Sequence, residues 1–248
     1  MIYFDEYNRI EKEKWIKKYP QFIQKIFYNT KNIFDYYDGE VSPLVKKGAV
    51  ILDAGCGKKG IMNKYIGNGA VIVGSDLEIA AIKRNEAMQY KTLSSLDSLC
   101  FKDETFDLIV SQWVVEHLPE PERVFREFNR VLKKGGSLIL VTNSIYNPLM
   151  TFNAIMPQKL RDNIKKRVLP PEIEEDTFPT YYRANSIGRL NNIMAAIGFK
   201  KCFSVYTSDT SFFIFSKWLF YFSLLFEHIT DIPLLRPLRM HIVAHYRK

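Results

Sequence analysis

A short apolar segment that ends in an acidic residue and a glycine turn constrains the fold of this chain more than any other feature. Residues 50–57 have the sequence VILDAGCG. The apolar run is typical of a buried parallel strand that ends at Leu52. Gly55 and Gly57 lack a Cβ atom, so the backbone there can adopt positive φ angles and approach a ligand closely. Asp53 follows the strand at the carboxyl end, where open α/β sheets bind their ligands.

The acidic residue at this strand end limits the kind of ligand. A carboxylate suits a ligand with a cationic or hydroxyl group and disfavours a naked phosphate. S-adenosylmethionine (SAM) carries an amino group, a sulfonium and a ribose diol, so we predict a SAM site. A dinucleotide site is one alternative, because Gly55, Gly57 and Gly60 also fit the pattern GxGxxG. A glycine turn that binds nothing is the other. None of the 14 tyrosines has a lysine four residues later, which argues against a short-chain dehydrogenase.

Length and composition indicate one large α/β domain with additions, since the 248 residues are 47% hydrophobic. The net charge of +8 favours anionic partners such as membrane surfaces, nucleic acid or acidic glycans, although solubility explains most of the scattered lysines. The three cysteines form no C-x-x-C pair, which suits a reducing cytosol, and we recognise no metal-ligand cluster. The first 18 residues lack the apolar region of a signal peptide.

Strands and helices alternate along the chain, which predicts a doubly wound parallel sheet. The expected strands lie at 50–54, 70–75, 91–93, 106–111, 137–142, 200–207 and 241–246, and the expected helices at 58–66, 77–90, 121–132 and 184–197.

Two segments interrupt this alternation. Residues 144–183 contain five prolines, a basic block and an acidic block, and segments of this length are usually lids or binding loops. Residues 211–229 are intensely aromatic and predict a helix that is too short to span a membrane. A buried cross-over helix, a dimer face and an interfacial membrane helix all stay open for it. We expect Phe222 and Phe226 to face the sheet, and Phe220 and Tyr221 to face a partner or the lid.

Five segments together resemble those of the class I SAM-dependent methyltransferases, closest to the type 11 methyltransferase family. They are ILDAGCG at 51–57, GSD at 74–76, LCFKDETFDLIVS at 99–111, VEHL at 115–118 and LKKGG at 132–136. The resemblance covers residues 48–142 well and 184–248 loosely. It implies a Rossmann-like, seven-stranded, doubly wound sheet with a lid insert after the fifth strand. Residues 1–46 would form a helical cap, and residues 47–248 a SAM-binding domain with the lid insert (144–183) and the aromatic helix (211–229).

The resemblance also implies roles for particular residues. Asp53 would face the methionine end of SAM, and Asp76 would accept hydrogen bonds from both ribose hydroxyls. The alternative for Asp76 is a helix N-cap. The other implied contacts are Gly55, Cys56 and Gly57 along methionine and ribose, Leu77 on the adenine, and Ser111 and Gln112 at the methionine carboxylate or amine.

The chain departs from the family pattern at the adenine contact. The family usually places there an Asp that binds the adenine amino group, whereas this chain has Ser95 at the aligned position. We expect the Ser95 hydroxyl and the Leu96 backbone N–H to contact adenine. Asp97, two residues after Ser95, is expected in a surface loop.

Methyl transfer from a sulfonium mainly requires alignment of donor and acceptor, and a base is needed only for a hydroxyl or a protonated amine. By location, the candidate catalytic residues are His117, Tyr181 and Tyr182. A structural histidine is the alternative for His117, and Trp113 is expected either to wall the acceptor pocket or to pack in the core.

The predicted function is SAM-dependent O-methylation of a glycan, a lipid-linked acceptor or another amphipathic small molecule, with S-adenosylhomocysteine as product. An N- or C-methyltransferase of secondary metabolism and an NAD-type oxidoreductase are the alternatives. We expect no nucleic-acid acceptor, because residues 111–114 read SQWV where such enzymes have an Asp/Asn-Pro-Pro-Tyr-like motif. We predict a cytoplasmic protein and leave open peripheral contact with the inner membrane surface, as well as the choice between monomer and homodimer.

Overall fold

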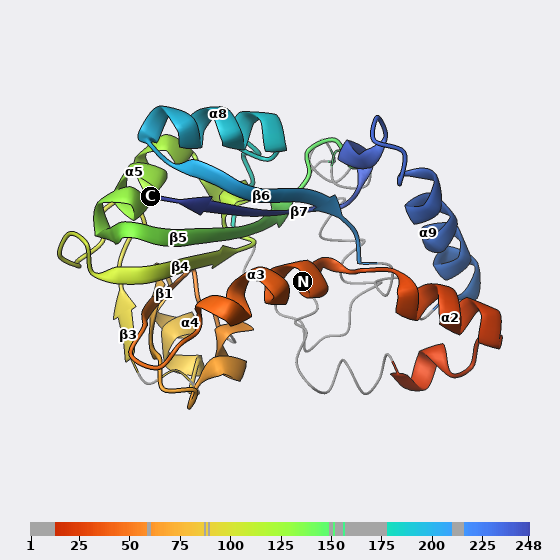
Figure 1. The fold of residues 1–248 in the computed structure, drawn as a ribbon, viewed down its shortest axis with the longest axis horizontal. Helices are drawn as coiled ribbons and strands as arrows, with labels where there is room; N and C mark the ends of the chain where they lie inside the picture. Colours follow the sequence, from red (N-terminus) through yellow and green to blue (C-terminus); the bar gives the residue numbers. More distant parts are fainter. Residues whose placement is uncertain are drawn as a thin grey trace.

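A seven-stranded sheet forms the centre of the molecule (Figure 1). The computed structural model describes residues 13–58, 61–86, 88, 90–148, 151, 156, 178–209 and 216–248. The strand order is β3-β2-β1-β4-β5-β7-β6. The strands are β1 (Val50–Ala54), β2 (Val71–Asp76), β3 (Tyr90–Leu93), β4 (Phe106–Gln112), β5 (Leu132–Asn143), β6 (Lys200–Thr207) and β7 (His241–Arg247).

The predicted seven-stranded, doubly wound sheet is confirmed, but it is mixed rather than parallel. Strand β7 runs antiparallel to both of its neighbours, β5 and β6. The first residue of β7 therefore lies at the same edge of the sheet as the last residues of the other strands. This reversal brings a residue from near the end of the chain to the edge where ligands bind.

Helices cover both faces of the sheet (Figure 1). One face packs against α5 (Pro121–Val131) and α8 (Ile187–Ile197), and α5 buries Val124, Phe125 and Phe128 with the spacing of an amphipathic helix. The other face packs against α3 (Ile33–Val41) and the 3₁₀ turn η2 (Ile61–Tyr65).

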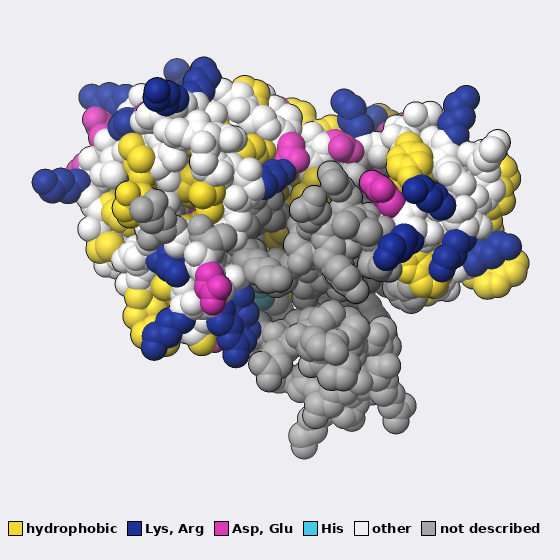
Figure 2. All heavy atoms as spheres, turned by 90° about the horizontal axis from the view of Figure 1, so that it is seen from below, with side chains coloured by type: hydrophobic (Ala, Val, Ile, Leu, Met, Phe, Trp, Pro, Cys, Tyr) yellow, Lys and Arg dark blue, Asp and Glu magenta, His cyan; other side chains and the backbone are white. Residues whose placement is uncertain are grey.

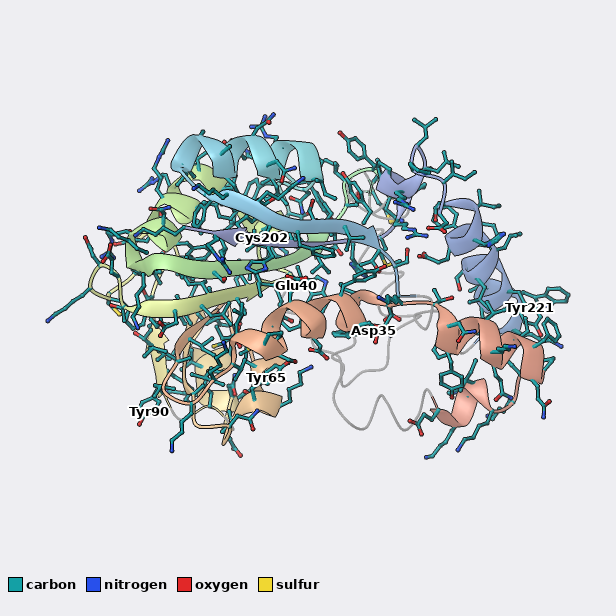
Figure 3. The ribbon with its side chains drawn as sticks, viewed as in Figure 1. Asp35, Glu40, Tyr65, Tyr90, Cys202 and Tyr221 are labelled. Carbon is teal, nitrogen blue, oxygen red and sulfur yellow. The ribbon has the colours of Figure 1, made fainter. Side chains whose placement is uncertain are left out.

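Helix α3 is fastened to the sheet by a side-chain hydrogen bond. Its Glu40 lies 2.7 Å from Nδ1 of His245 on β7, whose Nε2 lies 2.9 Å from the Ser137 hydroxyl (Glu40 is labelled in Figure 3). A capping box between Asn32 and Asp35 starts the helix. These contacts fix which side of α3 packs against the sheet.

Two predicted helices are shorter in the structure. The helix expected at 77–90 is α4 (Ile79–Arg84), and of the helix expected at 58–66 the described part is the turn η2. Helix α4 ends at its C-cap residue Asn85. The side chain of Asn85 donates hydrogen bonds to the backbone oxygens of Cys56 and Gly57.

The N-terminal segment and the aromatic segment pack together, away from the sheet. Helix α2 (Gln21–Asn29) begins directly after Pro20, and η1 (Ser42–Leu44) follows α3. The aromatic segment forms α9 (Lys217–Ile229), which lies beside α2 in Figure 1. Their shared cluster includes Tyr19, Ile23, Phe220 and Leu224. We call the described residues 13–30 and 216–234 the α2/α9 lobe.

This arrangement corrects the expected orientation of α9. Phe220 and Leu224 are the buried residues and Phe222 is exposed, so the helix packs on the N-terminal segment rather than on the sheet. Residues 211–215 and most of the predicted lid lie outside the described residues. Within the part that is described, no helix has the length and hydropathy that a membrane span requires.

Candidate functional site

Five strands each place a polar side chain on the α3 face of the sheet at its carboxyl edge. The apolar residues two positions away along each strand belong to the cluster under α3, and side chains two apart share a face. Asn143, His241 and Thr207 are direct neighbours in register. The five are Asp53 of β1, Gln112 of β4, Asn143 of β5, His241 of β7 and Thr207 of β6.

The glycine turn after β1 has the backbone geometry predicted from sequence. Gly55 has φ +81° and Gly57 has φ +55°. A Cβ atom on Gly55 would lie 2.3 Å from Cγ2 of Val114, so only glycine fits there. The Gly55 N–H donates to the Ser75 oxygen at 2.8 Å, and the Asn85 amide donates to the Gly57 oxygen at 3.2 Å. The turn is therefore held from β2 and from the end of α4.

Asp76 supports the same turn. Its Oδ2 accepts from the Gly57 N–H at 2.9 Å, and its Oδ1 accepts from the Glu78 N–H at 3.0 Å. Asp76 does not cap α4, because the N-cap position is Glu78. A carboxylate offers about four acceptor positions. Both oxygens can therefore still accept from a ribose diol, and the exposed side chains of Leu77 and Leu93 flank the site.

Asp53 is a buried carboxyl with an unused oxygen. Its Oδ2 has no hydrogen-bond partner among the described residues. Burial, and then the charge of Asp76, raise the pKa of Asp53 to about 7. An unpaired carboxyl beside a second carboxylate is a site where a cation or a strong donor lowers the free energy most.

Gln112 provides a second unused acceptor near Asp53. Its Nε2 donates to the Tyr37 hydroxyl of α3 at 2.6 Å, while its Oε1 is buried without a partner among the described residues. Asp53 also raises the pKa of Tyr37, after burial as the main cause, so the three groups lie close together. Two buried oxygens without donors fit an ammonium group and repel a phosphate.

Cys56 and Ser111, both predicted to contact the cofactor, have supporting contacts in the turn. Burial, followed by the charges of Asp53 and Asp76, raises the pKa of the Cys56 thiol to about 12. The Ser111 hydroxyl donates to the Ala54 oxygen at 2.9 Å and thereby ties β4 to β1. Their contacts with a cofactor remain predictions.

At the expected adenine contact, Ser95 and Asp97 act as a pair. The Ser95 hydroxyl donates to Asp97, which also lies 3.5 Å from Arg123. Leu96 is buried between them. Asp97 lies in a turn, as expected, and in addition it is the partner that orients the Ser95 hydroxyl.

Glu116 is a buried connection point that the sequence analysis passed over in favour of His117. Its two carboxyl oxygens accept from the Thr142 hydroxyl at 2.7 Å and from the Asn143 amide at 2.8 Å. Its backbone oxygen accepts from the N–H of Tyr181 at 2.7 Å. Burial is the main cause that raises the pKa of Glu116.

The three predicted catalytic residues lie close together beside the backbone of Glu116. His117 Nδ1 lies 2.9 Å from the Pro179 oxygen, and its ring centroid lies 6.0 Å from that of Phe178. Tyr182 has φ +51°, a strained angle for a residue other than glycine, and its N–H also bonds to Glu116. The structure thus places His117, Tyr181 and Tyr182 where the chain returns from the predicted lid.

A hydrogen-bond chain leads from Glu116 to His241. Because the Asn143 amide nitrogen donates to Glu116, its Oδ1 faces His241 and lies 3.0 Å from Nδ1 of that residue. An amide oxygen only accepts, so Nδ1 carries the proton and Nε2 carries the lone pair. Burial lowers the pKa of His241 to about 4, against the opposing charge of Asp209, so the imidazole is neutral.

Trp113 closes the site between α3 and β7. Its ring centroid lies 6.3 Å from those of Phe34 and His241. Its φ angle of +52° is strained, and its Nε1 is buried without a partner among the described residues. The expectation that Trp113 walls a pocket is consistent with this position.

Tyr37, Asn85, Glu116, Asn143 and His241 are site residues that the sequence analysis missed. Open α/β sheets bind ligands at the carboxyl ends of their strands. This expectation was used for β1, β2 and β4, and its use for β5 as well would have indicated Asn143. His241 had no comparable signal, because its position depends on the antiparallel insertion of β7.

Residues 52–140 match the family model described as a methyltransferase domain. Over 134 residues, or 47% of this chain and 66% of the relative, the chain is 31% identical to a phosphatidylethanolamine N-methyltransferase of Cereibacter sphaeroides. It is 27% identical over 103 residues to a ubiquinone biosynthesis O-methyltransferase of Coxiella burnetii, covering 39% of this chain and 44% of that protein. The matches thus span less than two thirds of the length of these relatives.

The crystal structure of an S-adenosylmethionine-dependent methyltransferase from Mesorhizobium loti has a similar fold. The TM-score is 0.60 at 18% identity, and the match covers 86% of this chain and 97% of that one. Likeness at this identity concerns the fold, and it confirms the predicted sheet.

Proposed function

Because the chain carries a methyltransferase domain of the type 11 family, we propose that it transfers a methyl group from SAM to an amphipathic acceptor. The observation that carries the proposal is the pair of buried, unpartnered oxygens of Asp53 and Gln112 beside Asp76. An ammonium donor neutralises Asp53 and occupies both oxygens. A dinucleotide would bring a pyrophosphate close to Asp53, so this carboxyl favours SAM over the oxidoreductase alternative.

Different residues of the chain would bind different parts of SAM. Asp53 and Gln112 take the amino group, Asp76 takes the ribose hydroxyls, and Leu77 and Leu93 cover the adenine. The Ser95 hydroxyl and the Leu96 N–H meet the adenine edge. SAM supplies the methyl group, whose bond to sulfur breaks as its bond to the acceptor atom forms.

His241 is placed to accept the proton of the acceptor. Its Nε2 has no hydrogen bond to any described residue and lies on the same face as Asp53 and Gln112. A hydroxyl oxygen becomes strongly acidic as it receives a methyl group, so a neutral imidazole with a low pKa suffices as the base. His117, Tyr181 and Tyr182 remain candidates, and they would contact a larger acceptor.

An oxygen acceptor with an apolar part is the first choice. The neutral Nε2 suits a hydroxyl, and Trp113 and Phe34 provide an apolar wall. Relatives named for methylation of a lipid amine and of ubiquinone fit an amphipathic acceptor. A nitrogen acceptor is the second candidate, because one of these relatives is an N-methyltransferase.

Two assays test the proposal. Calorimetry should give micromolar dissociation constants for SAM and S-adenosylhomocysteine, typical of cosubstrates, and tighter binding of NAD would contradict it. SAM labelled in the methyl group should then be offered with lipid and aqueous extracts of cells that make the protein. Label in the lipid fraction supports an amphipathic acceptor, and label confined to polar products contradicts it.

A further inference from the structure

Helix α9 is apolar on two opposite faces. Phe220 and Leu224 are buried against Tyr19 and Ile23. Residues at spacings of four, three and four share the opposite face of the helix and form an apolar stripe. These residues, with their exposed fractions, are Trp218 (81%), Phe222 (64%), Leu225 (55%) and Ile229 (48%).

The exposed apolar surface extends beyond the stripe. Ile232 and Leu234, just after α9, are 57% and 86% exposed, and Phe22 and Ile26 of α2 are also exposed. Isolated exposed apolar residues are ordinary, but such a concentration on one small lobe marks an interaction surface. Figure 3 shows Tyr221 of this lobe pointing away from the sheet, at the opposite end of the molecule from Tyr90.

Basic side chains accompany this surface. Figure 2 shows Lys and Arg side chains gathered around the apolar patches of the lobe. Two of the lysines lie beside aromatic rings: Lys18 Nζ is 4.0 Å from the centroid of Trp15, and Lys217 Nζ is 5.9 Å from that of Tyr221. In the α2/α9 lobe the exposed cations Lys14, Lys17, Lys18, Lys25 and Lys217 outnumber the exposed acids Glu13 and Asp231.

The positive charge of the α2/α9 lobe and the length of α9 together indicate which partner the apolar surface binds. Helix α9 has 13 residues, whereas a spanning helix needs about 20, so it can lie on a bilayer but not cross it. A second copy of the chain would bring the same lysines against one another. A bilayer with anionic lipid offers an apolar layer to the aromatic stripe and negative headgroups to the lysines.

We propose that the α2/α9 lobe is a docking surface for a bilayer that contains anionic lipid, with the stripe of α9 inserted at the level of the headgroups. This deepens the proposed function, because a docked enzyme would draw an amphipathic acceptor from the bilayer. Docking itself requires neither SAM nor acceptor, so a failure of docking is distinguishable from a failure of methyl transfer.

Vesicle flotation without SAM tests the proposal. The probes are vesicles of phosphatidylcholine alone and vesicles with 30% phosphatidylglycerol. The wild type should bind the anionic vesicles at least ten-fold more strongly than the neutral ones. Replacing Trp218 and Phe222 together with Ser should abolish binding and leave the melting temperature unchanged, since both side chains are exposed. Lys17→Glu with Lys18→Glu should lower binding to the anionic vesicles only.

The matched control replaces two exposed apolar residues outside the lobe, Ile66→Ser and Tyr90→Ser, and should bind as the wild type does. Three results would overturn the proposal: no binding by the wild type, equal binding by the Trp218 and Phe222 variant, or an equal loss in the control. A wild-type dimer that the Trp218 and Phe222 variant converts to a monomer would assign the surface to a second copy instead.

Discussion

The two halves of the carboxyl edge differ in how their polar groups are satisfied. Around β1 and β2, Asp53 keeps an unpartnered oxygen and lies near a second carboxylate. Around β5 and β7, Glu116, Asn143 and His241 satisfy one another. The first half is incomplete without a cationic ligand. The second has its carboxylate and amide paired, and it presents to an acceptor the His241 lone pair, the Trp113 N–H and the Thr207 hydroxyl, which has no partner among the described residues. Binding energy is therefore expected from the first half and orientation from the second.

The largest effect is expected from Glu116→Ala, in the half around β5 and β7. The substitution leaves the buried donors of Thr142 and Asn143 without their acceptor, which should cost about 3 kcal/mol of unfolding free energy. Urea denaturation measures this. The control is Glu120→Ala, which removes an exposed ion pair with Arg123 and should leave the unfolding free energy nearly unchanged. Equal losses would show that the buried bonds of Glu116 contribute no more to stability than an exposed ion pair does.

Asp76→Ala should weaken SAM binding by roughly 2 to 3 kcal/mol, because two charge-assisted hydrogen bonds to the ribose disappear. The Gly57 N–H also loses its acceptor, so the turn becomes less ordered. Asp97→Ala should cost much less in the same calorimetric titration, since Asp97 acts through Ser95. If the two variants bind SAM equally, the adenine contact does not lie at Ser95.

Asp53→Asn should stabilise the unliganded protein at high pH while it weakens SAM binding. The folded-state pKa of Asp53 is raised to about 7, so its contribution to stability is present below the unfolded pKa and is lost as pH rises through about 7. The gain of the variant over the wild type should grow by roughly 2 kcal/mol between pH 5 and pH 8. Urea denaturation at both pH values tests this, and a difference that does not change with pH contradicts it.

The smallest expected effect concerns His241, whose protonation state should not change between pH 5 and pH 8. Because burial lowers its pKa to about 4, its NMR signals should not titrate between pH 5 and pH 8, and Nε2 should be the unprotonated nitrogen. Asn143→Ala removes the acceptor of the Nδ1 proton, so the His241 proton should then be shared between Nδ1 and Nε2. SAM binding should stay unchanged. Protonation of Nε2 in the wild type, or a titration midpoint near 6.5, would remove His241 as the acceptor of the proton.

The difference between the halves also explains what the sequence could predict. Asp53 and the glycine turn are contiguous, and Asp76 follows at the end of the next strand, so local pattern and strand order were enough to predict these residues. Tyr37 of the same half was missed, because its hydrogen bond comes from a strand 75 residues away. The acceptor half joins Asn143 to His241, 98 residues apart. That contact depends on the antiparallel β7, which periodicity alone does not reveal.

Helix α9 shows the same limit at the level of packing. Its residues are apolar on both faces, so periodicity could not determine which face is buried. The contacts with Tyr19 and Ile23, from a distant part of the chain, decide it.

The central claim is that Asp53 receives the amino group of SAM. The most direct test compares S-adenosylhomocysteine with 5′-methylthioadenosine, which lacks the amino-acid portion, on the wild type and on Asp53→Asn by calorimetry. The substitution should weaken S-adenosylhomocysteine binding by roughly ten- to a hundred-fold, the worth of one charge-assisted hydrogen bond, and leave methylthioadenosine nearly unchanged. Equal weakening of both ligands, or of neither, would contradict the assignment of this site.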